Sequence, residues 1–214
     1  MTLPPQLAAL LPADTAEAWV ILADLVPASA ALYGGTALAA HLHHRTSRDL
    51  DFFLDEPTDL NAIAAALELH RPLAIERLTS DTLNGLFGRT KVQFLDATGQ
   101  HVLVPSTAIA GLAVASIPDL LATKLKVLLD RPALRDYVDL MRIEQDTAFS
   151  GVDGIGFYVA RYGAVAEQTL PDLVRALGYF DDVVDEPGLG TSRDVVVDYW
   201  QRRQPAIIAA LDRR

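Results

Sequence analysis

The sequence predicts an α+β fold, a mixed α/β domain with a mixed or antiparallel sheet followed by an all-helical region. Three observations predict it. Short strand-like runs alternate with helix-like segments up to residue 117, and the apolar period is helical from residue 118 onward. Half of the 214 residues are hydrophobic, which is enough to bury a core. We therefore expect two domains, residues 1–117 and residues 118–214.

The elements expected in the first domain follow from local composition. A double glycine predicts a tight strand-to-helix turn, and turn residues separate four short runs that predict an antiparallel meander. In order, the expected elements are a helix over 15–26, a strand over 31–33, a helix over 36–44, a strand over 49–55, a helix over 58–70, and meander strands in LAIERLTS, TLNGLFGR, KVQFLDA and HVLVPS.

The second domain is predicted to be helical throughout. Its clearest periodic segments are 118–130 and 133–145. The remaining helices are expected over 151–163, 169–178 and 192–212, with an acidic, turn-rich loop over 180–190. A crevice between the two domains is the default expectation for a ligand site.

Charge and composition exclude several classes of function. The chain has no cysteine, so disulfides and thiolate metal sites are excluded, and a reducing cytoplasm is expected. No apolar run reaches the roughly 20 residues of a membrane span, and no basic leader segment precedes the first helix. A formal net charge of −10 argues against a dedicated nucleic-acid scaffold, although a local basic groove stays compatible with it.

Two aspartates stand one residue apart in the phenylalanine-rich run DLDFFLD. Asp49 and Asp51 project from one face of the predicted strand, because side chains alternate along a strand, while Leu50 and Phe52 project into the core. Two like charges at this spacing repel each other, so the pair is tolerated at low cost only at the surface or around a shared cation. Hard carboxylate oxygens suit Mg²⁺, which takes one or two carboxylates together with substrate phosphates and water.

The double glycine upstream supplies the complementary half of a site. Gly34 and Gly35 let the backbone approach a phosphate, and the N–H groups of Gly35, Thr36 and the first helical turn would point at the anion. A phosphate turn followed after 13 residues by a metal-binding strand would place a nucleoside triphosphate over a metal. That combination indicates nucleotidyl transfer, in which positioning and charge neutralisation carry most of the catalysis.

The pattern GG-x13-DLDF resembles the signature of the polymerase-β-type nucleotidyltransferases. Within that superfamily, YGGTALAAHLHHRTSRDLDFF is similar to the AbiEii/AbiGii family, the nucleotidyltransferase toxins of type IV toxin–antitoxin (abortive infection) systems. Two later blocks resemble the same family, IPDLLATKLKVLLDRPALRDYVDLMRI and LVRALGYFDDVVDEP. The resemblance covers roughly residues 30 to 200, in order.

The resemblance implies a role for individual residues. Asp49 and Asp51 would hold Mg²⁺, as one ion or two, with Mn²⁺ as a substitute, and an NTP would be the substrate. Lys124 would neutralise triphosphate charge, and Asp136 or Asp139 on the next helix would support Lys124, the metal or the acceptor. The remaining substrate-binding residues implied are Gly34, Gly35, Thr36, Arg45, Arg48 and Asp139.

Three features of this chain depart from the family pattern. His43 stands where a glycine is usual, and Arg48 stands where a small or apolar residue is usual. The third carboxylate of the superfamily has no clear counterpart. Asp96 is the only acid in KVQFLDA but lies at the strand's end, and Gln93 can occupy the expected place instead.

Structural explanations compete for the same residues. Lys124 lies near Leu121, Leu125 and Leu128, so its stem can pack on the core while its amine reaches water. Asp136 and Asp139 can belong to a solvated helix face with i,i+3 pairs.

The predicted function is a Mg²⁺-dependent transfer of a nucleoside monophosphate from an NTP to a hydroxyl. The resemblance implies an RNA acceptor, tRNA in particular, a toxin role and a cognate antitoxin as partner. Two alternatives stay open: a nucleotidyltransferase for a small-molecule acceptor, and an inactive protein of the same fold that binds NTP or a partner.

Overall fold

The computed structural model describes residues 2–163 and 166–212, and the chain falls into two compact units, Met1–Ser116 and Ile117–Arg214. In the first unit the described elements are, in order, α1 (Pro5–Ala8), α2 (Ala13–Leu22), β1 (Ala30–Tyr33), α3 (Gly34–Leu42), β2 (Leu50–Leu54), α4 (Leu60–Glu68), β3 (Leu73–Leu78), β4 (Thr82–Phe87), β5 (Thr90–Asp96), β6 (Thr107–Ile109) and β7 (Leu112–Val114). In the second unit they are α5 (Ile117–Asp130), α6 (Leu134–Asp146), α7 (Gly151–Tyr162), α8 (Thr169–Gly178) and α9 (Arg193–Leu211).

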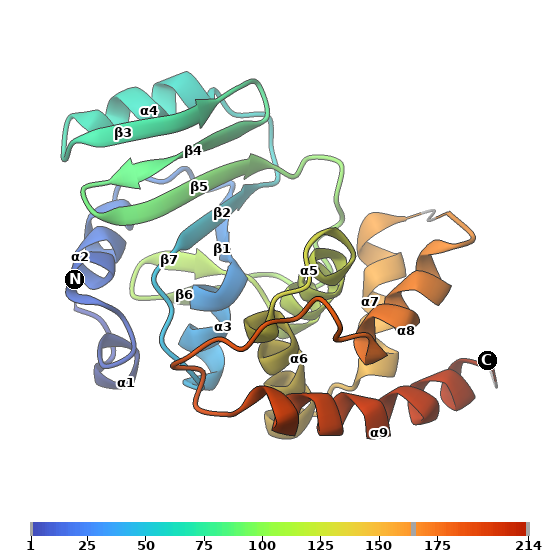
Figure 1. The fold of residues 1–214 in the computed structure, drawn as a ribbon. Coiled ribbons are helices and arrows are strands. Elements are labelled where there is room, and N and C mark those ends of the chain that lie inside the picture. The colour runs from blue at the N-terminus through green and yellow to red at the C-terminus, as the bar shows by residue number, and fades with distance from the viewer. Residues whose placement is uncertain (1, 164–165, 213–214) are drawn as a thin grey trace. The chain divides into compact units, whose positions relative to one another are not determined.

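The first unit is built on one mixed sheet, with strand order β3-β4-β5-β2-β1-β7-β6 (Figure 1). Strand β2 pairs antiparallel with β1 and parallel with β5, and β1 pairs parallel with β7. The other pairs, β3 with β4, β4 with β5 and β6 with β7, are antiparallel. This confirms the predicted fold class.

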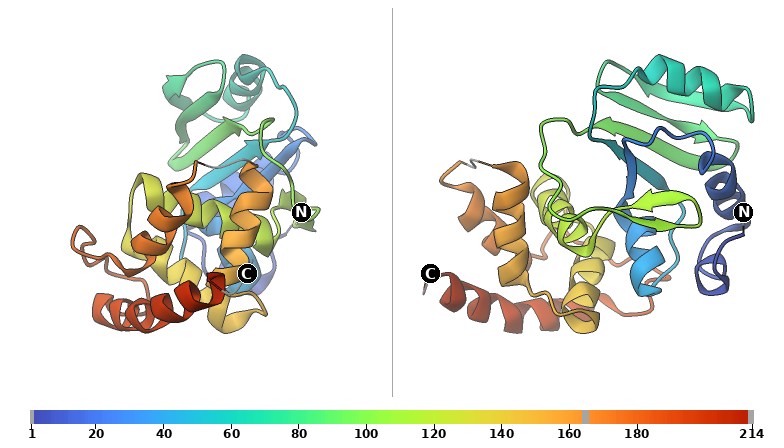
Figure 2. Two further views of the ribbon diagram at one scale, coloured as in Figure 1. Left: turned by 90° about the vertical axis from the view of Figure 1, so that its right-hand side faces the viewer. Right: turned by 180° about the vertical axis from the view of Figure 1, so that it is seen from behind.

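Alternation along β2 separates a core face from a polar face. Leu50, Phe52 and Leu54 are buried, whereas Asp51 and Phe53 between them are only half-buried. Helices α2, α3 and α4 pack against the sheet, α4 on strands β3 and β4 (Figures 1 and 2). Burying alternate apolar side chains supplies the main driving force for this register.

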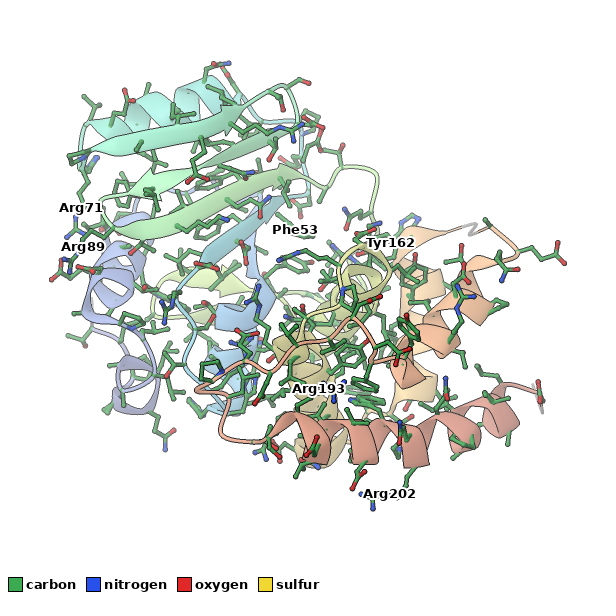
Figure 3. The ribbon with its side chains drawn as sticks, in the orientation of Figure 1. Phe53, Arg71, Arg89, Tyr162, Arg193 and Arg202 are labelled. Carbon is green, nitrogen blue, oxygen red and sulfur yellow. The ribbon has the colours of Figure 1, made fainter. Side chains whose placement is uncertain are left out.

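Helix α2 is attached to the sheet end by specific polar contacts. Trp19 is fully buried and donates its indole N–H to the carbonyl of Ala110 at 3.1 Å. Two ion pairs, Arg71 with Glu17 and Arg89 with Asp14, bind the exposed side of α2 (Figure 3). Such exposed pairs contribute little stability each, so the buried indole is the main anchor.

The helical unit is held together by buried polar groups as well as by apolar packing. The fully buried Arg161 lies 2.5 Å from Asp119, which joins α7 to α5. The indole of Trp200 on α9 donates to the carbonyl of Tyr137 at 3.1 Å, and the guanidinium of Arg193 donates to the carbonyls of Phe180 and Val183 (Figure 3). These bonds fix the long helix α9 and the acidic loop before it.

The segment HVLVPS departs from the predicted meander. Residues 101–106 form no strand, and Val102 and Val104 are exposed. The last strands are instead the short hairpin β6–β7, whose connecting residues Ala110 and Gly111 both have positive φ. A two-residue loop of this kind matches the twist of a hairpin, which explains why the strand pair forms there.

Most of the described helices agree with their predicted ranges within about two residues, and none has both the length and the apolar character that a bilayer crossing requires. Helix α1 was not predicted, and α2 ends at Leu22 rather than at residue 26. Helix α3 begins on the two glycines themselves rather than after them.

His43 ends α3 in the left-handed conformation, at φ 51° and ψ 34°. Left-handed backbone costs an ordinary L-residue roughly 1–2 kcal/mol, and glycine adopts it without that cost. The conformation accounts for the glycine that the family resemblance implies at this position.

We therefore predict that His43→Gly stabilises the protein by about 1 kcal/mol, or roughly 2–4 °C in melting temperature. His70→Gly is the matched control, because His70 is also exposed and follows a helix but has no positive φ. The control should lose stability through the backbone entropy of glycine. Thermal unfolding of both variants measures these changes in stability, and a destabilised His43→Gly protein would contradict the prediction.

Candidate active site

The turn from β1 into α3 leaves the first backbone N–H groups of the helix without a side-chain cap. Strand β1 ends at Tyr33, and Gly34 starts the helix with φ +72°, a conformation that favours glycine. Tyr33 provides no side-chain cap, so the first N–H groups of α3 are not used by a capping side chain. An uncapped N-terminus of a nine-residue helix is suited to bind an anion.

The carboxylate of Asp51 lies directly against this turn. A Cβ added to Gly34 would overlap Asp51 Oδ2 and lie 3.2 Å from its Cγ. The contact arises because Tyr33 and Asp51 are paired in the antiparallel β1–β2 ladder. Gly34 is therefore required for two independent reasons, its positive φ and the space that Asp51 occupies.

Gly35 makes the same kind of close approach to a cation. A Cβ at this position would lie 2.5 Å from Arg45 Nη2 and 3.0 Å from Ser47 Oγ. Arg45 is 8% exposed, and its Nη1 donates to the carbonyl of Thr46 at 3.1 Å. The structure thus places a buried guanidinium beside the phosphate turn, where it can attract an anion.

Thr36 shapes the loop that carries Asp49. Its buried hydroxyl donates to the carbonyl of Asp49 at 2.5 Å and lies 2.8 Å from Ser47 Oγ. The hydroxyl is therefore used inside the protein, and only the backbone of Thr36 is left for the predicted phosphate contact. Arg48 is exposed, and its carbonyl accepts from the hydroxyl of Thr15 at 3.0 Å.

The pairing of β2 with β5 shows which residue lies beside Asp51, where a third carboxylate was considered. In the parallel β2–β5 pair, Asp51 is opposite Gln93, whereas Asp96 is opposite Leu54. Asp96 is exposed, and its Oδ1 accepts the N–H of Thr98 at 2.9 Å in the turn after the strand. The residue beside Asp51 is thus a neutral amide.

The donor set suits a hard divalent cation held jointly with substrate. Among residues 2–163 and 166–212, no group of three or more His, Cys, Asp or Glu side chains is placed to hold a metal. The Asp51 carboxylate lies against the uncapped start of α3, and Asp49 directly precedes β2, where its carbonyl accepts from Thr36. Carboxylate oxygens suit Mg²⁺, which completes its shell with phosphate and water oxygens.

A second cluster of predicted residues lies within the helical unit. Lys124 Nζ is 2.6 Å from Asp136 Oδ1 and 2.6 Å from Asp139 Oδ2, and all three side chains are at most 8% exposed. The Oδ2 atom of Asp136 is buried and has no hydrogen-bond partner among the described residues. With all three groups ionised, the cluster carries one excess negative charge.

The burial of Lys124 contradicts the alternative in which its amine reaches water past an apolar stem, and the burial of Asp136 and Asp139 contradicts the solvated helix face. The structure brings Gly34, Gly35 and Asp51 together in the first unit, and the lysine and its two aspartates together in the second.

Sequence analysis missed Ser47, whose hydroxyl lies close to both Gly35 and Thr36. The only signal for it was a short polar residue two positions before Asp49.

Comparisons with known proteins agree with this geometry. Residues 21–84, which include the glycine turn and both aspartates, match the family model described as nucleotidyl transferase AbiEii toxin, type IV TA system. The predicted resemblance to the AbiEii nucleotidyltransferases is confirmed. The match supports the predicted nucleotidyltransferase enzyme and a toxin of the type IV class. No curated protein sequence matches the chain.

Solved structures share the fold of this chain at low sequence identity. MenT4, a nucleotidyltransferase toxin from Mycobacterium tuberculosis H37Rv, is 17% identical with a TM-score of 0.61, and the alignment covers 95% of this chain and 83% of that one. A proposed nucleotidyltransferase from H. pylori is 15% identical with a TM-score of 0.58, covering 92% and 93%. At these identities the likeness concerns the fold.

We predict that Gly34→Ala removes binding of a magnesium–NTP complex, because the new methyl group displaces the Asp51 carboxylate. Gly188→Ala is the matched control, since Gly188 has φ +85° and nothing within 4 Å of an added Cβ. Both variants should lose roughly 1–2 kcal/mol of stability to the strained backbone. Calorimetric titration with Mg²⁺-NTP and urea unfolding separate the two effects, and undiminished binding by Gly34→Ala would contradict the prediction.

Lys124→Met should destabilise the protein by about 3–5 kcal/mol, because it leaves two buried carboxylates without their cation. Lys126→Met on the same helix is the control. Lys126 is 46% exposed, lies 3.9 Å from Asp130 and stands 5.6 Å from the centroid of the Tyr162 ring, so its loss should cost no more than about 1 kcal/mol. Equal stabilities of the two variants in urea unfolding would show that the buried ion pairs are absent.

Proposed function

We propose that the protein is a Mg²⁺-dependent nucleotidyltransferase that moves a nucleoside monophosphate from an NTP to a hydroxyl of RNA, tRNA in particular. The observation that carries the proposal is the Asp51 carboxylate packed against the Gly34 turn at the uncapped start of α3. This arrangement supports the proposal, because a bound metal–triphosphate complex requires a carboxylate oxygen beside N–H groups that can bind phosphates.

In the proposed mechanism, each residue acts by position and charge. The N–H groups at the start of α3 bind the terminal phosphates, and Arg45 adds positive charge beside Gly35. Asp49 and Asp51 would hold Mg²⁺, as one ion or two, with Mn²⁺ as a substitute. When bound, the metal would neutralise phosphate charge.

Lys124 and Arg48 are proposed to add to the same neutralisation, and Thr36 holds the loop that presents Asp49. Asp136 and Asp139 are proposed to orient the Lys124 amine, since each accepts a short ion pair from it.

We further propose a toxin of a type IV toxin–antitoxin system, acting in the cytoplasm and controlled by a cognate antitoxin. The family match of residues 21–84 supports this role. A small-molecule acceptor is the competing possibility, and the net charge of −10 favours it. The salt dependence of tRNA binding separates the two, because only a polyanionic acceptor loses affinity steeply as salt rises.

The decisive experiment combines purified protein, Mg²⁺, labelled NTPs and total tRNA. We expect labelled tRNA from wild type, and on the order of 10²–10³-fold less from Asp51→Asn, which keeps the shape but removes the charge. Asp55→Asn, an exposed aspartate just after β2, is the matched control and should stay active. Growth arrest on expression should disappear with Asp51→Asn. An unlabelled tRNA pool would refute the RNA acceptor, and an active Asp51→Asn enzyme would refute the site.

A further inference from the structure

A row of polar residues crosses four strands beside Asp51. Asp51 is paired with Gln93, Gln93 with Asn84, and Asn84 with Arg77, on β2, β5, β4 and β3 in turn. Directly paired residues project from the same face of a sheet, and strands are about 4.8 Å apart. The row therefore extends from the carboxylate over about 14 Å of the polar face.

The amide of Gln93 has hydrogen-bonding capacity to spare. Its side chain is half-buried and has no hydrogen-bond partner among the described residues. Asn84 next to it is also half-buried, and its Oδ1 accepts only from the hydroxyl of Thr82, at 3.3 Å. Half-buried amides normally satisfy these groups with protein, water or ligand.

Charge along the same face suits a polyanion. Lys91 precedes Gln93 by two positions on β5, which places both side chains on one face, and Lys91 is exposed. Arg77 at the far end of the row is exposed as well. On strands β3, β4 and β5 the acids are Glu76, which is exposed next to Arg77, and Asp96, whose Oδ1 accepts the N–H of Thr98 in the turn after β5.

The direction of the reaction selects the side from which the acceptor arrives. Phosphoryl transfer places the attacking and leaving oxygens roughly in line across the reacting phosphorus. In the proposed function, the Gly34–Gly35 turn binds the leaving pyrophosphate on the β1 side of Asp51. The attacking hydroxyl must then come from the opposite side, where β5 presents Gln93.

We propose that Gln93 positions the acceptor hydroxyl and that the polar face of β5, β4 and β3 binds the RNA acceptor strand. This rests on the proposed function and adds the acceptor side to it. The Gln93 Oε1 accepts the hydrogen bond of the attacking hydroxyl, Asn84 contacts the adjoining sugar or base, and Lys91 and Arg77 contact phosphates.

The chemistry balances without a protein base at this position. The acceptor oxygen forms a bond to the α-phosphorus, the bond from that phosphorus to the bridging oxygen breaks, and pyrophosphate leaves. The hydroxyl proton passes to solvent, because a glutamine amide does not take up a proton near neutral pH. Gln93 is therefore a positioning residue, and a carboxylate at the same place would introduce a base.

The test compares Gln93→Ala and Gln93→Glu with Gln6→Glu, which makes the same charge change at an exposed glutamine of α1. Binding of fluorescently labelled total tRNA is measured by anisotropy without NTP, and binding of a fluorescent NTP is measured separately. We expect tRNA affinity to fall about 3–10-fold in Gln93→Ala and further in Gln93→Glu, with NTP affinity within about twofold of wild type.

The pH profile of transfer gives a second, independent readout. Gln93→Glu should add an inflection to the rate profile, since an ionisable group now touches the reacting hydroxyl. Wild type, Gln93→Ala and Gln6→Glu should lack that inflection. A purely structural role for Gln93 would not produce it.

Three outcomes overturn the inference: Gln93 variants that bind tRNA like wild type, variants that lose NTP and tRNA affinity together, and transfer only to a small-molecule hydroxyl. A wild-type protein that binds tRNA but transfers nothing refutes the proposed function instead. The tRNA comparison between wild type and Gln93→Ala then still decides the acceptor surface.

Discussion

The close approach of the Asp51 carboxylate to Gly34, which leaves no room for a Cβ there, is the constraint on which the candidate site depends. One antiparallel ladder, β1 with β2, fixes both groups, because Tyr33 next to the turn is paired with Asp51. A site on a strand and the start of a helix is held more rigidly than one on loops. The absence of a side chain at residue 34 therefore sets the distance between the uncapped start of α3 and the Asp51 carboxylate.

Close packing of the same kind recurs around the turn. Arg45 and Ser47 fill the volume beside Gly35, and the hydroxyl of Thr36 ties down the loop before β2. Side chains that were expected to face the substrate thus divide into two groups. Some present charge at the turn, and others hold the backbone that presents it.

Local pattern was enough to predict most of the elements and the half-buried face of β2 on which Asp51 lies. The alternation of DLDFF predicted which side chains of β2 are buried, and the glycines predicted the turn. The pattern failed at HVLVPS, where the alternation is present but residues 101–106 form no strand and both valines are exposed. Strand pairing is a tertiary property, and the Ala110–Gly111 turn that forms the real hairpin lacks the usual asparagine or aspartate signal.

Register and burial were beyond what the sequence could predict. Gln93 was recognised as a substitute for a carboxylate, but only the parallel pairing places it opposite Asp51 rather than farther along the strand. Lys124 and its two aspartates are 12 and 15 positions apart on successive helices, and spacing alone does not indicate whether they meet. The structure shows two short ion pairs in a buried setting, where each partner is costly without the others.

The parallel pairing of β2 with β5 also bears on when the protein can become active during synthesis. A chain emerges from the ribosome at about 5–20 residues per second, so Thr90–Asp96 follows Leu50–Leu54 after several seconds. Until then β2 has an unpaired edge, which is prone to association with other chains. A nascent chain therefore passes through an interval in which the glycine turn and the aspartates exist but the strand beside them does not.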